Sequence, residues 1–304
     1  MRRLPLSLIA AALIGTTGLI ASPAVAAGKA SQHERHAHHA GDHQAPTPAP
    51  IPAIDPALAA AVADGRRDAD RARDRWRHPA ETLAFFDVKP TMKVGEYAPG
   101  GGWYSRLLGM YLGPRGKLVG LFFNPAGGPF NEKSQVGIRE GAARFPGEVA
   151  GWSGQPADRF AAYTLDAVPE GEKGSFDRIL VIRMMHNLMR WNIADAEIKA
   201  MRALLKDDGL IGVVQHRARA DAPFAYADGS KGYLRQADVV KFMEVNGFDL
   251  VGASEVNANP ADTAQWPDGV WTLPPALRLG EADRARYETV GETDRMTLLF
   301  RKRP

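Results

Sequence analysis

The 304-residue sequence contains no cysteine. A disulfide, a thiolate nucleophile and a cysteine-ligated metal centre are therefore excluded. With 45% hydrophobic residues, a chain of this length can bury a substantial core and does not need disulfides, even in an oxidising compartment. The composition is that of a globular protein with one large domain or two small ones.

A strong excess of charge of one sign is also missing. The formal net charge is +3, and it falls to +1 when Arg2 and Arg3 at the N-terminus are left out. Domains that bind nucleic acids usually carry a basic patch or stripe. The short basic run at residues 301–303 is typical of a solvated chain end instead. We therefore expect no nucleic-acid partner.

Long apolar runs are missing after residue 26. Residues 1–26 have the three parts of a secretory signal peptide, which are a basic start, an apolar segment and a small-residue cleavage pattern: Arg2-Arg3, Leu4 to about Ile20, and Ala24-Val25-Ala26. We expect cleavage, export to the periplasm, and no stable membrane span once the leader is removed. The alternative is an uncleaved N-terminal membrane anchor.

Residues 27–56 have no apolar periodicity and are dominated by histidine and proline. Five of the eight histidines of the chain lie here: His33, His36, His38, His39 and His43. Such a segment cannot bury enough apolar surface to fold, so we predict a disordered linker. Several imidazoles on one flexible segment can also bind a divalent metal weakly, and this alternative stays open. No other metal site is predicted.

Helices are expected over residues 57–92, ahead of the first strand. The alanine-rich, charged stretch from Ala57 to Asp74 favours an exposed helix with internal ion pairs. Pro79 lies where a second helix is expected to begin. His78 is then a residue at a helix start.

From residue 93 to the C-terminus, short apolar runs alternate with helical stretches. Strands are expected at MKVGEY, GKLVGLFF, AAYTLD, FDRILVIRM, LIGVVQH, FDLVGASEV and RMTLLFRK, and helices at WYSRLLGMYL, Gln135–Arg144, AEIKAMRALL and QADVVKFMEVNG. This alternation predicts an α/β fold with a parallel sheet and helices on both faces. The last strand, Arg295–Lys302, is expected to be antiparallel and to complete the sheet.

Three consecutive glycines, Gly100–Gly102, follow the first expected strand. They allow a sharp turn and leave backbone N–H groups open to an anionic end of a cofactor. The helix expected from Trp103 adds the positive end of its dipole. A glycine-rich turn without a ligand is the alternative. Ser105 and Asn124 stand where a dinucleotide site needs a small residue and an acid, which argues against NAD or FAD.

Several motifs together carry a resemblance to a known family. Glu96, Ala98, Gly100 and Gly102 match an acid-x-Gly-x-Gly-x-Gly motif with alanine in place of the first glycine. Further matching segments are LDAVPEGEKGSFDRILVIRMMHNL, ALLKDDGLIGVVQHR, RHPAETLAFF, SEVNANPADT and DGVWTLPP. From about Trp76 onward, the chain resembles class I S-adenosylmethionine-dependent methyltransferases, and within them most closely a group of exported bacterial predicted methyltransferases whose substrates are not established.

The resemblance implies a Rossmann-like seven-stranded sheet at residues 93–304, mostly parallel with an antiparallel last strand, and S-adenosylmethionine as the cofactor. It implies cofactor contacts from one set of residues: Glu96, Ala98, Gly100, Gly101, Gly102, Asn124 and Asp166. Asp166 would contact the adenine amino group. Asn124 departs from the family, which commonly has an acid there to bind the ribose hydroxyls.

His186 and Asn187 follow the fourth expected strand, where the methyl group usually lies in this fold. The resemblance therefore implies His186 as a candidate base and Asn187 as a positioning residue, with His216 a weaker candidate. A histidine that only holds the loop is the alternative. Likewise, Trp103 and Tyr104 are either ligand contacts or core residues, and residues 254–280 are either a substrate lid or a structural connection.

The sequence thus favours an exported methyltransferase that acts on an unknown small molecule or envelope component. The alternative is a catalytically inactive protein of the same fold that binds an adenosyl compound or another small ligand. Export and Asn124 favour that alternative, since the cofactor is made in the cytoplasm and an amide brings no charge to a cationic ligand.

Overall fold

The computed structural model describes residues 48–304. The predicted leader, residues 1–26, and the five histidines of the predicted linker lie outside the described residues. The end of the linker differs from the prediction of disorder through residue 56. The Ala49 N–H donates to the carbonyl of Ala253 at 2.8 Å, so this stretch lies against the edge of the sheet. Within the described residues, no helix has the length and apolar character needed to cross a membrane.

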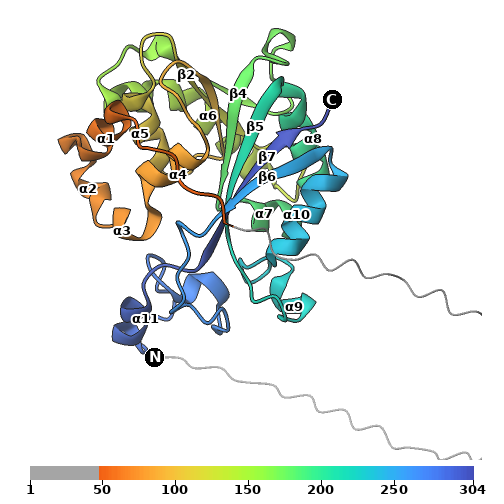
Figure 1. Ribbon diagram of the computed structural model, residues 1–304. Helices are drawn as coiled ribbons and strands as arrows, with labels where there is room; N and C mark the ends of the chain where they lie inside the picture. The colour runs from red at the N-terminus through yellow and green to blue at the C-terminus, as the bar shows by residue number, and fades with distance from the viewer. Residues whose placement is uncertain (1–47) are drawn as a thin grey trace, which may run out of the picture. The chain divides into compact units, whose positions relative to one another are not determined.

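Seven strands form one sheet in the order β3-β2-β1-β4-β5-β7-β6 (Figure 1). They are β1 (Lys93–Tyr97), β2 (Lys117–Phe122), β3 (Phe160–Thr164), β4 (Phe176–Ile182), β5 (Leu205–His216), β6 (Phe248–Ser254) and β7 (Arg295–Lys302). The first five strands are parallel, and β7 lies antiparallel between β5 and β6. The predicted fold class, with its antiparallel last strand, is confirmed. Strand order reverses between β1 and β4, which is where open α/β sheets bind ligands.

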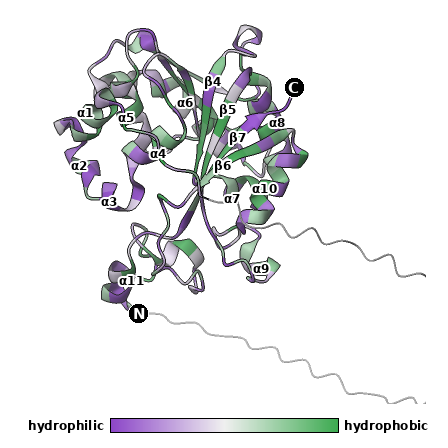
Figure 2. Ribbon diagram, in the orientation of Figure 1, coloured by the Kyte–Doolittle hydropathy of each residue, from purple (hydrophilic) through white to green (hydrophobic). Residues whose placement is uncertain are grey.

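Helices cover both faces of the sheet (Figure 1). One face carries α1 (Pro56–Ala63), α4 (Pro79–Phe85), α5 (Trp103–Tyr111) and α6 (Glu132–Ser153), and the other carries α7 (Met185–Arg190), α8 (Ala194–Leu204) and α10 (Gln236–Val245). Adjacent strand residues point to opposite faces, so Leu180 packs under α5 and α6 while Val181 packs under α7 and α8. Burial on both faces explains the apolar runs at residues 179–182 of β4 and 210–214 of β5 (Figure 2).

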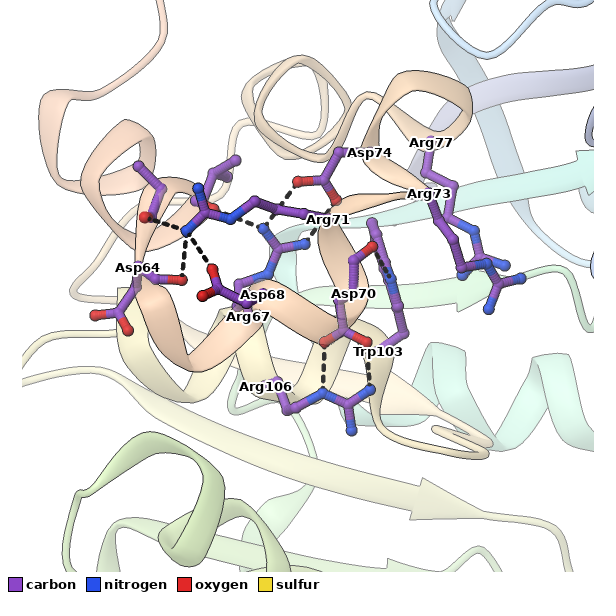
Figure 3. A network of polar contacts seen from close by, with 12 residues as sticks. Asp64, Arg67, Asp68, Asp70, Arg71, Arg73, Asp74, Arg77, Trp103 and Arg106 are labelled. Carbon is purple, nitrogen blue, oxygen red and sulfur yellow. Dashed lines mark hydrogen bonds and ion pairs between the residues drawn. The ribbon is translucent and has the colours of Figure 1, made fainter.

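The N-terminal helices differ from the prediction of one exposed helix over Ala57–Asp74. Asp64 and Gly65 break it, because Asp64 Oδ1 accepts from the backbone N–H of Arg66 at 2.9 Å and starts a new turn. The chain then forms η1 (Gly65–Arg67), α2 (Asp68–Arg71) and α3 (Asp74–Arg77). Arg67 is fully buried and pairs with Asp74 (Figure 3). Helix α4 begins at Pro79, as predicted.

The long connection between β6 and β7 has a small core of its own. In this core, residues of the connection pack against two residues that follow β5, Ala218 and Tyr233. The residues from the connection are Trp266, Val270, Leu273 and Tyr287. Asp262 anchors it, since its carboxylate accepts from Tyr233 Oη and Trp266 Nε1. Short helices α9 (Phe224–Ala227) and α11 (Arg284–Val290) belong to the same region. These contacts favour the interpretation of residues 254–280 as a structural connection.

Candidate functional site

The loop between β1 and α5 adopts the left-handed conformation at three residues. They are Ala98 with φ 47°, Gly100 with φ 58° and Gly102 with φ 74°. Ala98 therefore pays a steric cost that the glycine of the resembled motif would avoid. Gly100 and Gly101 are exposed, and a Cβ placed on Gly101 would meet nothing within 4 Å. The backbone at these two glycines is thus open at the carboxyl edge of the sheet.

Gly102 has a different reason to be glycine. A Cβ at this position would overlap the indole ring of Trp152, which comes from α6. Arg106 lies on the same ring, with its guanidinium carbon 5.1 Å from the ring centre. Packing of α5 against α6 therefore already requires Gly102, independently of any ligand.

Glu96 is buried near the end of β1 and is held by the first turn of α5. Ser105 Oγ donates to Glu96 Oε2 at 2.5 Å. Burial raises the pKa of Glu96 to about 8, against the opposing effects of Ser105 and Arg106. Ser105, which departs from the dinucleotide fingerprint, is therefore the hydrogen-bond partner of the acid.

Asn124 follows β2 as predicted, but its side chain is used locally. Asn124 Oδ1 accepts from the backbone N–H of Ala126 at 3.0 Å and closes a turn. A buried acid lies beside it instead, because Glu197 of α8 accepts from the Asn124 backbone N–H at 3.0 Å and from Tyr97 Oη at 2.7 Å. Burial raises the pKa of Glu197.

Glu197 was missed by sequence reasoning, although the sequence holds a signal for it. Glu197, Met201 and Leu204 are spaced as i, i+4 and i+7, which places them on one face of a helix. Met201 and Leu204 are buried, and Glu197 is buried with them. The periodicity thus points to an acid on the inner face of α8.

Asp166 is exposed just after β3 and pairs with Arg139 of α6 at 3.2 Å. Burial alone would raise the pKa of Asp166, but hydrogen bonds from Thr164 and Arg139 lower it. Its negative charge in turn raises the pKa of Glu197. Asn124, Asp166 and Glu197 therefore form one polar group at the ends of β2 and β3.

His186 lies in the first turn of α7, after β4. Its Nδ1 is 3.2 Å from Gln215 Oε1, whose own orientation is fixed because Gln215 Nε2 donates to the carbonyls of Gly232 at 2.8 Å and His216 at 3.2 Å. An amide oxygen only accepts, so Nδ1 carries the proton and Nε2 keeps the lone pair. Burial, with Arg190 and Arg183, lowers the pKa of His186 to about 4. The ring is thus neutral near pH 7.

Unpaired polar atoms gather on the turn that joins β4 to α7. Asn187 Nδ2 contacts Met184 Sδ at 3.3 Å, while Asn187 Oδ1 is buried without a partner among residues 48–304. Arg183 has φ 56°, and its buried Nε likewise has no partner within that part of the chain. Backbone strain and unpaired polar atoms are both more common at functional sites. Arg183 was missed because a charged residue at a strand end is common and carries no motif.

His216, at the end of β5, lies close to His186. The two ring centres are 5.5 Å apart, and His216 Nδ1 is 2.5 Å from Thr293 Oγ1. Burial lowers the pKa of His216, so it is also neutral near pH 7. Trp271 of the long connection completes this side, with its ring centre 6.1 Å from that of His186.

Trp103 and Tyr104 are core residues of α5. Their ring centres are 4.8 Å apart, and both side chains are buried. The Arg77 guanidinium carbon lies 4.8 Å from the centre of the Trp103 ring, while Trp103 Nε1 donates to the Asp70 carbonyl at 3.4 Å (Figure 3). These contacts favour a structural role over a ligand contact.

The structure groups the sequence-predicted residues in two places. The glycine loop lies beside the β4–α7 turn with His186 and Asn187, since β1 and β4 pair with Tyr97 opposite Val181. Asn124 and Asp166 lie further along the edge, at the ends of β2 and β3. In the part of the chain from residue 48 on, no group of three or more His, Asp and Glu side chains is placed to hold a metal ion.

No protein-family model matches the chain, and no curated protein matches it. Solved structures do resemble it. A methyltransferase from Aquifex aeolicus that depends on S-adenosylmethionine is 16% identical, with a TM-score of 0.44 over 67% of this chain and 94% of that one. The (4+2)-cyclase SpnF is 16% identical, with a TM-score of 0.48 over 79% and 84%.

A third solved structure is a Burkholderia thailandensis enzyme, 1,6-didemethyltoxoflavin-N1-methyltransferase, with bound 1,6-didemethyltoxoflavin and S-adenosylhomocysteine. It is 13% identical, with a TM-score of 0.43 over 88% of this chain and 99% of that one. Structural similarity at such low sequence identity concerns the fold alone. The ligands and reactions named for these proteins are not assigned to this chain. The sheet of this chain is the seven-stranded, mostly parallel one with an antiparallel last strand that is typical of the class I methyltransferase fold.

Proposed function

We propose that the chain is a class I methyltransferase that uses S-adenosylmethionine and methylates a small molecule or an envelope component. The observation that carries the proposal is the pairing of an open glycine loop after β1 with a neutral histidine after β4. Gly100 and Gly101 are free of neighbouring side chains, and His186 keeps an unprotonated Nε2 at the adjacent strand end.

The residues at this edge fit the proposed cofactor. The loop backbone can donate N–H groups to a carboxylate, and Glu96 just before the loop can balance a cation once it ionises. Asn124 and Asp166 provide polar groups at the ends of β2 and β3 for the adenosine end, beside the buried acid Glu197. The Oδ1 of Asn187 is buried without a partner among residues 48–304, and a donor on a ligand would satisfy it.

When bound, S-adenosylmethionine would supply a methyl group that passes in line from its sulfonium sulfur to the acceptor, with S-adenosylhomocysteine as the leaving group. The chain then has to align the acceptor, exclude water and remove a proton where the acceptor is weakly acidic. His186 would take that proton at Nε2, a role that is supported by the contact of Nδ1 with Gln215 Oε1, which fixes the orientation of the ring. Asn187 would orient the acceptor through its free Oδ1.

We propose that this chemistry takes place outside the cytoplasm, on the strength of residues 1–26 alone. Cell fractionation followed by N-terminal sequencing tests the compartment. A periplasmic product that begins near Ala27 is expected. A full-length cytoplasmic product would overturn the proposal of export, but it would not contradict the proposed methyl transfer.

Binding and transfer are tested separately on the mature chain, residues 27–304. Calorimetry compares S-adenosylmethionine, S-adenosylhomocysteine, NAD and NADP, and only the two adenosyl compounds are expected to bind. Transfer is followed with methyl-labelled S-adenosylmethionine and a periplasmic extract. His186→Ala is expected to retain cofactor binding and to lose most of the labelled product. Product formation at the wild-type rate in this variant would overturn the role of His186 as a base, and binding with no product from any fraction would overturn methyl transfer.

A further inference from the structure

Arg183 is the least compensated charge at the candidate site. It follows β4 directly, has a left-handed backbone, and its buried Nε has no hydrogen-bond partner among residues 48–304. Burial and the positive charge of Arg77 lower the pKa of Arg183 to about 9, which still leaves it charged near pH 7. The Arg183 side chain is only partly exposed, and a partly desolvated charge that lacks a partner is costly unless a ligand or water meets it.

The surroundings of Arg183 carry a surplus of positive charge. Glu292 is the buried acid at this place, and it accepts from Arg73 Nε at 2.8 Å, Arg77 Nε at 3.0 Å and Arg295 Nη1 at 3.1 Å. Burial would raise the pKa of Glu292, but these arginines with Arg183 lower it to about 2. The single negative charge of Glu292 is thus shared by three arginines, and Arg183 adds a fourth positive charge.

Other nearby acids are already engaged. Asp294 Oδ2 accepts from Arg217 Nε at 2.8 Å. Asp70 and Asp74 pair with arginines of their own, at 2.6 and 2.8 Å (Figure 3). Arg77, which is only 3% exposed, keeps its buried Nη2 without a partner among the described residues. Three buried guanidinium nitrogens among the described residues lack acceptors: Arg67 Nε, Arg77 Nη2 and Arg183 Nε.

We propose that the methyl acceptor of this enzyme carries an oxyanion, a carboxylate or a phosphate, that pairs with the guanidinium of Arg183 backed by Arg77. This inference rests on the proposed function, because it assigns the substrate class of the same site. A guanidinium fork matches the two oxygens of such a group. The pairing places the acceptor at the β4–α7 turn, three residues from His186.

The methionine end of the cofactor is a second source of a carboxylate, but it fits less well. That end also carries an ammonium group close to its carboxylate. The surplus of positive charge around Glu292 would repel the ammonium. An acceptor with an oxyanion and no adjacent cation matches the charge of the site better.

The test uses the mature chain with inorganic phosphate and sodium acetate as probes, followed by calorimetry and thermal unfolding at low ionic strength. Arg183→Met removes the charge and keeps much of the length. Arg183→Lys keeps the charge and loses the fork. Arg115→Met is the matched control, since Arg115 is exposed in the turn before β2 and its loss changes net charge equally.

We expect saturable binding of at least one probe to the wild-type chain and to Arg115→Met. Binding should weaken about tenfold or more in Arg183→Met and less in Arg183→Lys. Without any probe, Arg183→Met should unfold at the same or a higher temperature than the wild-type chain, because it removes an unpaired charge. A structural role for Arg183 would instead lower that temperature.

S-adenosylhomocysteine and 5′-methylthioadenosine separate the two sources of the anion, since the second compound lacks the methionine carboxylate. Unchanged affinity of Arg183→Met for both supports the inference. A selective loss of S-adenosylhomocysteine binding would overturn it in favour of the cofactor's own carboxylate. If S-adenosylhomocysteine binds and neither oxyanion does, the inference fails while the proposed function stands. If an oxyanion binds and neither adenosyl compound does, the proposed methyltransferase function is overturned, and with it the assignment of Arg183 to a methyl acceptor.

Discussion

Gly102 lies against the indole ring of Trp152, so that a Cβ at Gly102 would overlap the ring. The three consecutive glycines can be required for two different reasons, helix packing and ligand binding, and the contact with Trp152 distinguishes them. Gly102 serves helix packing, whereas Gly101 has no neighbour within 4 Å of the place its Cβ would take. Only a substitution at Gly101 therefore tests ligand binding without disturbing helix packing.

Gly102→Ala should therefore destabilise the protein. The left-handed φ of 74° disfavours alanine, and overlap with Trp152 adds a packing cost, so we expect a loss of about 2–4 kcal/mol in the free energy of unfolding. Urea unfolding measures it. Gly101→Ala is the control and should change stability by less than about 0.5 kcal/mol. Equal losses in the two variants would show that the two glycines are equivalent.

Ala98→Gly should stabilise the loop. Ala98 has a φ of 47°, which glycine adopts without a steric cost. Relief of this strain outweighs the extra entropy of glycine in the unfolded chain, and we expect a net gain of about 0.5–1 kcal/mol. Urea unfolding of the single variant measures the gain. A loss of stability would mean that the Ala98 methyl group contributes packing that exceeds its strain.

Glu96 should make stability fall as pH rises through the neutral range. Its pKa is about 8 in the folded chain and 4.5 for the unperturbed group, so between these values only the unfolded chain releases the proton. The free energy of unfolding then decreases as pH rises from about 4.5 to about 8. Urea unfolding across this interval should show a shallower decrease in Glu96→Gln. A parallel course in both proteins would contradict the raised pKa.

His186 should act in the opposite direction at acid pH. Its pKa is about 4 in the folded chain against 6.5 for the unperturbed ring, so the unfolded chain binds more protons between these values. Stability is then lost as pH falls from about 6.5 to about 4. Nitrogen-15 NMR, assigned with His186→Gln, should show a neutral ring protonated at Nδ1 at pH 6. An ordinary titration near 6.5 would contradict both the tautomer and its use as a base.

Glu292→Gln should be among the most damaging single changes in the chain. It leaves the guanidinium groups of Arg73, Arg77 and Arg295 without their shared carboxylate, and breaking a buried ion pair from one side costs about 3–5 kcal/mol. Asp249→Asn is the control, because Asp249 pairs with Arg303 at the surface at 3.5 Å and such pairs contribute about 0–1 kcal/mol. Similar losses of stability in both variants would show that the three buried arginines do not depend on the Glu292 carboxylate.

Local patterns in the sequence predicted most of the fold. All seven strands lie where short apolar runs predicted them, and in the central strands these runs reflect burial on both faces. The long-range polar pairs were beyond sequence reasoning, as with Arg73 and Glu292, which are 219 residues apart. The left-handed conformation of Arg183 also has no local signature. Glu197 is the exception, since helical periodicity alone places it on the buried face of α8.

The most direct measurement is calorimetry of S-adenosylhomocysteine against the mature wild-type chain and against Gly101→Val. We expect binding to the wild-type chain and a loss of about tenfold or more in Gly101→Val, because the new side chain occupies the open space over the loop. Gly101→Val should also unfold at the wild-type temperature. No binding by the wild-type chain at about millimolar ligand, or equal binding by a folded Gly101→Val, would contradict an adenosyl cofactor at this loop.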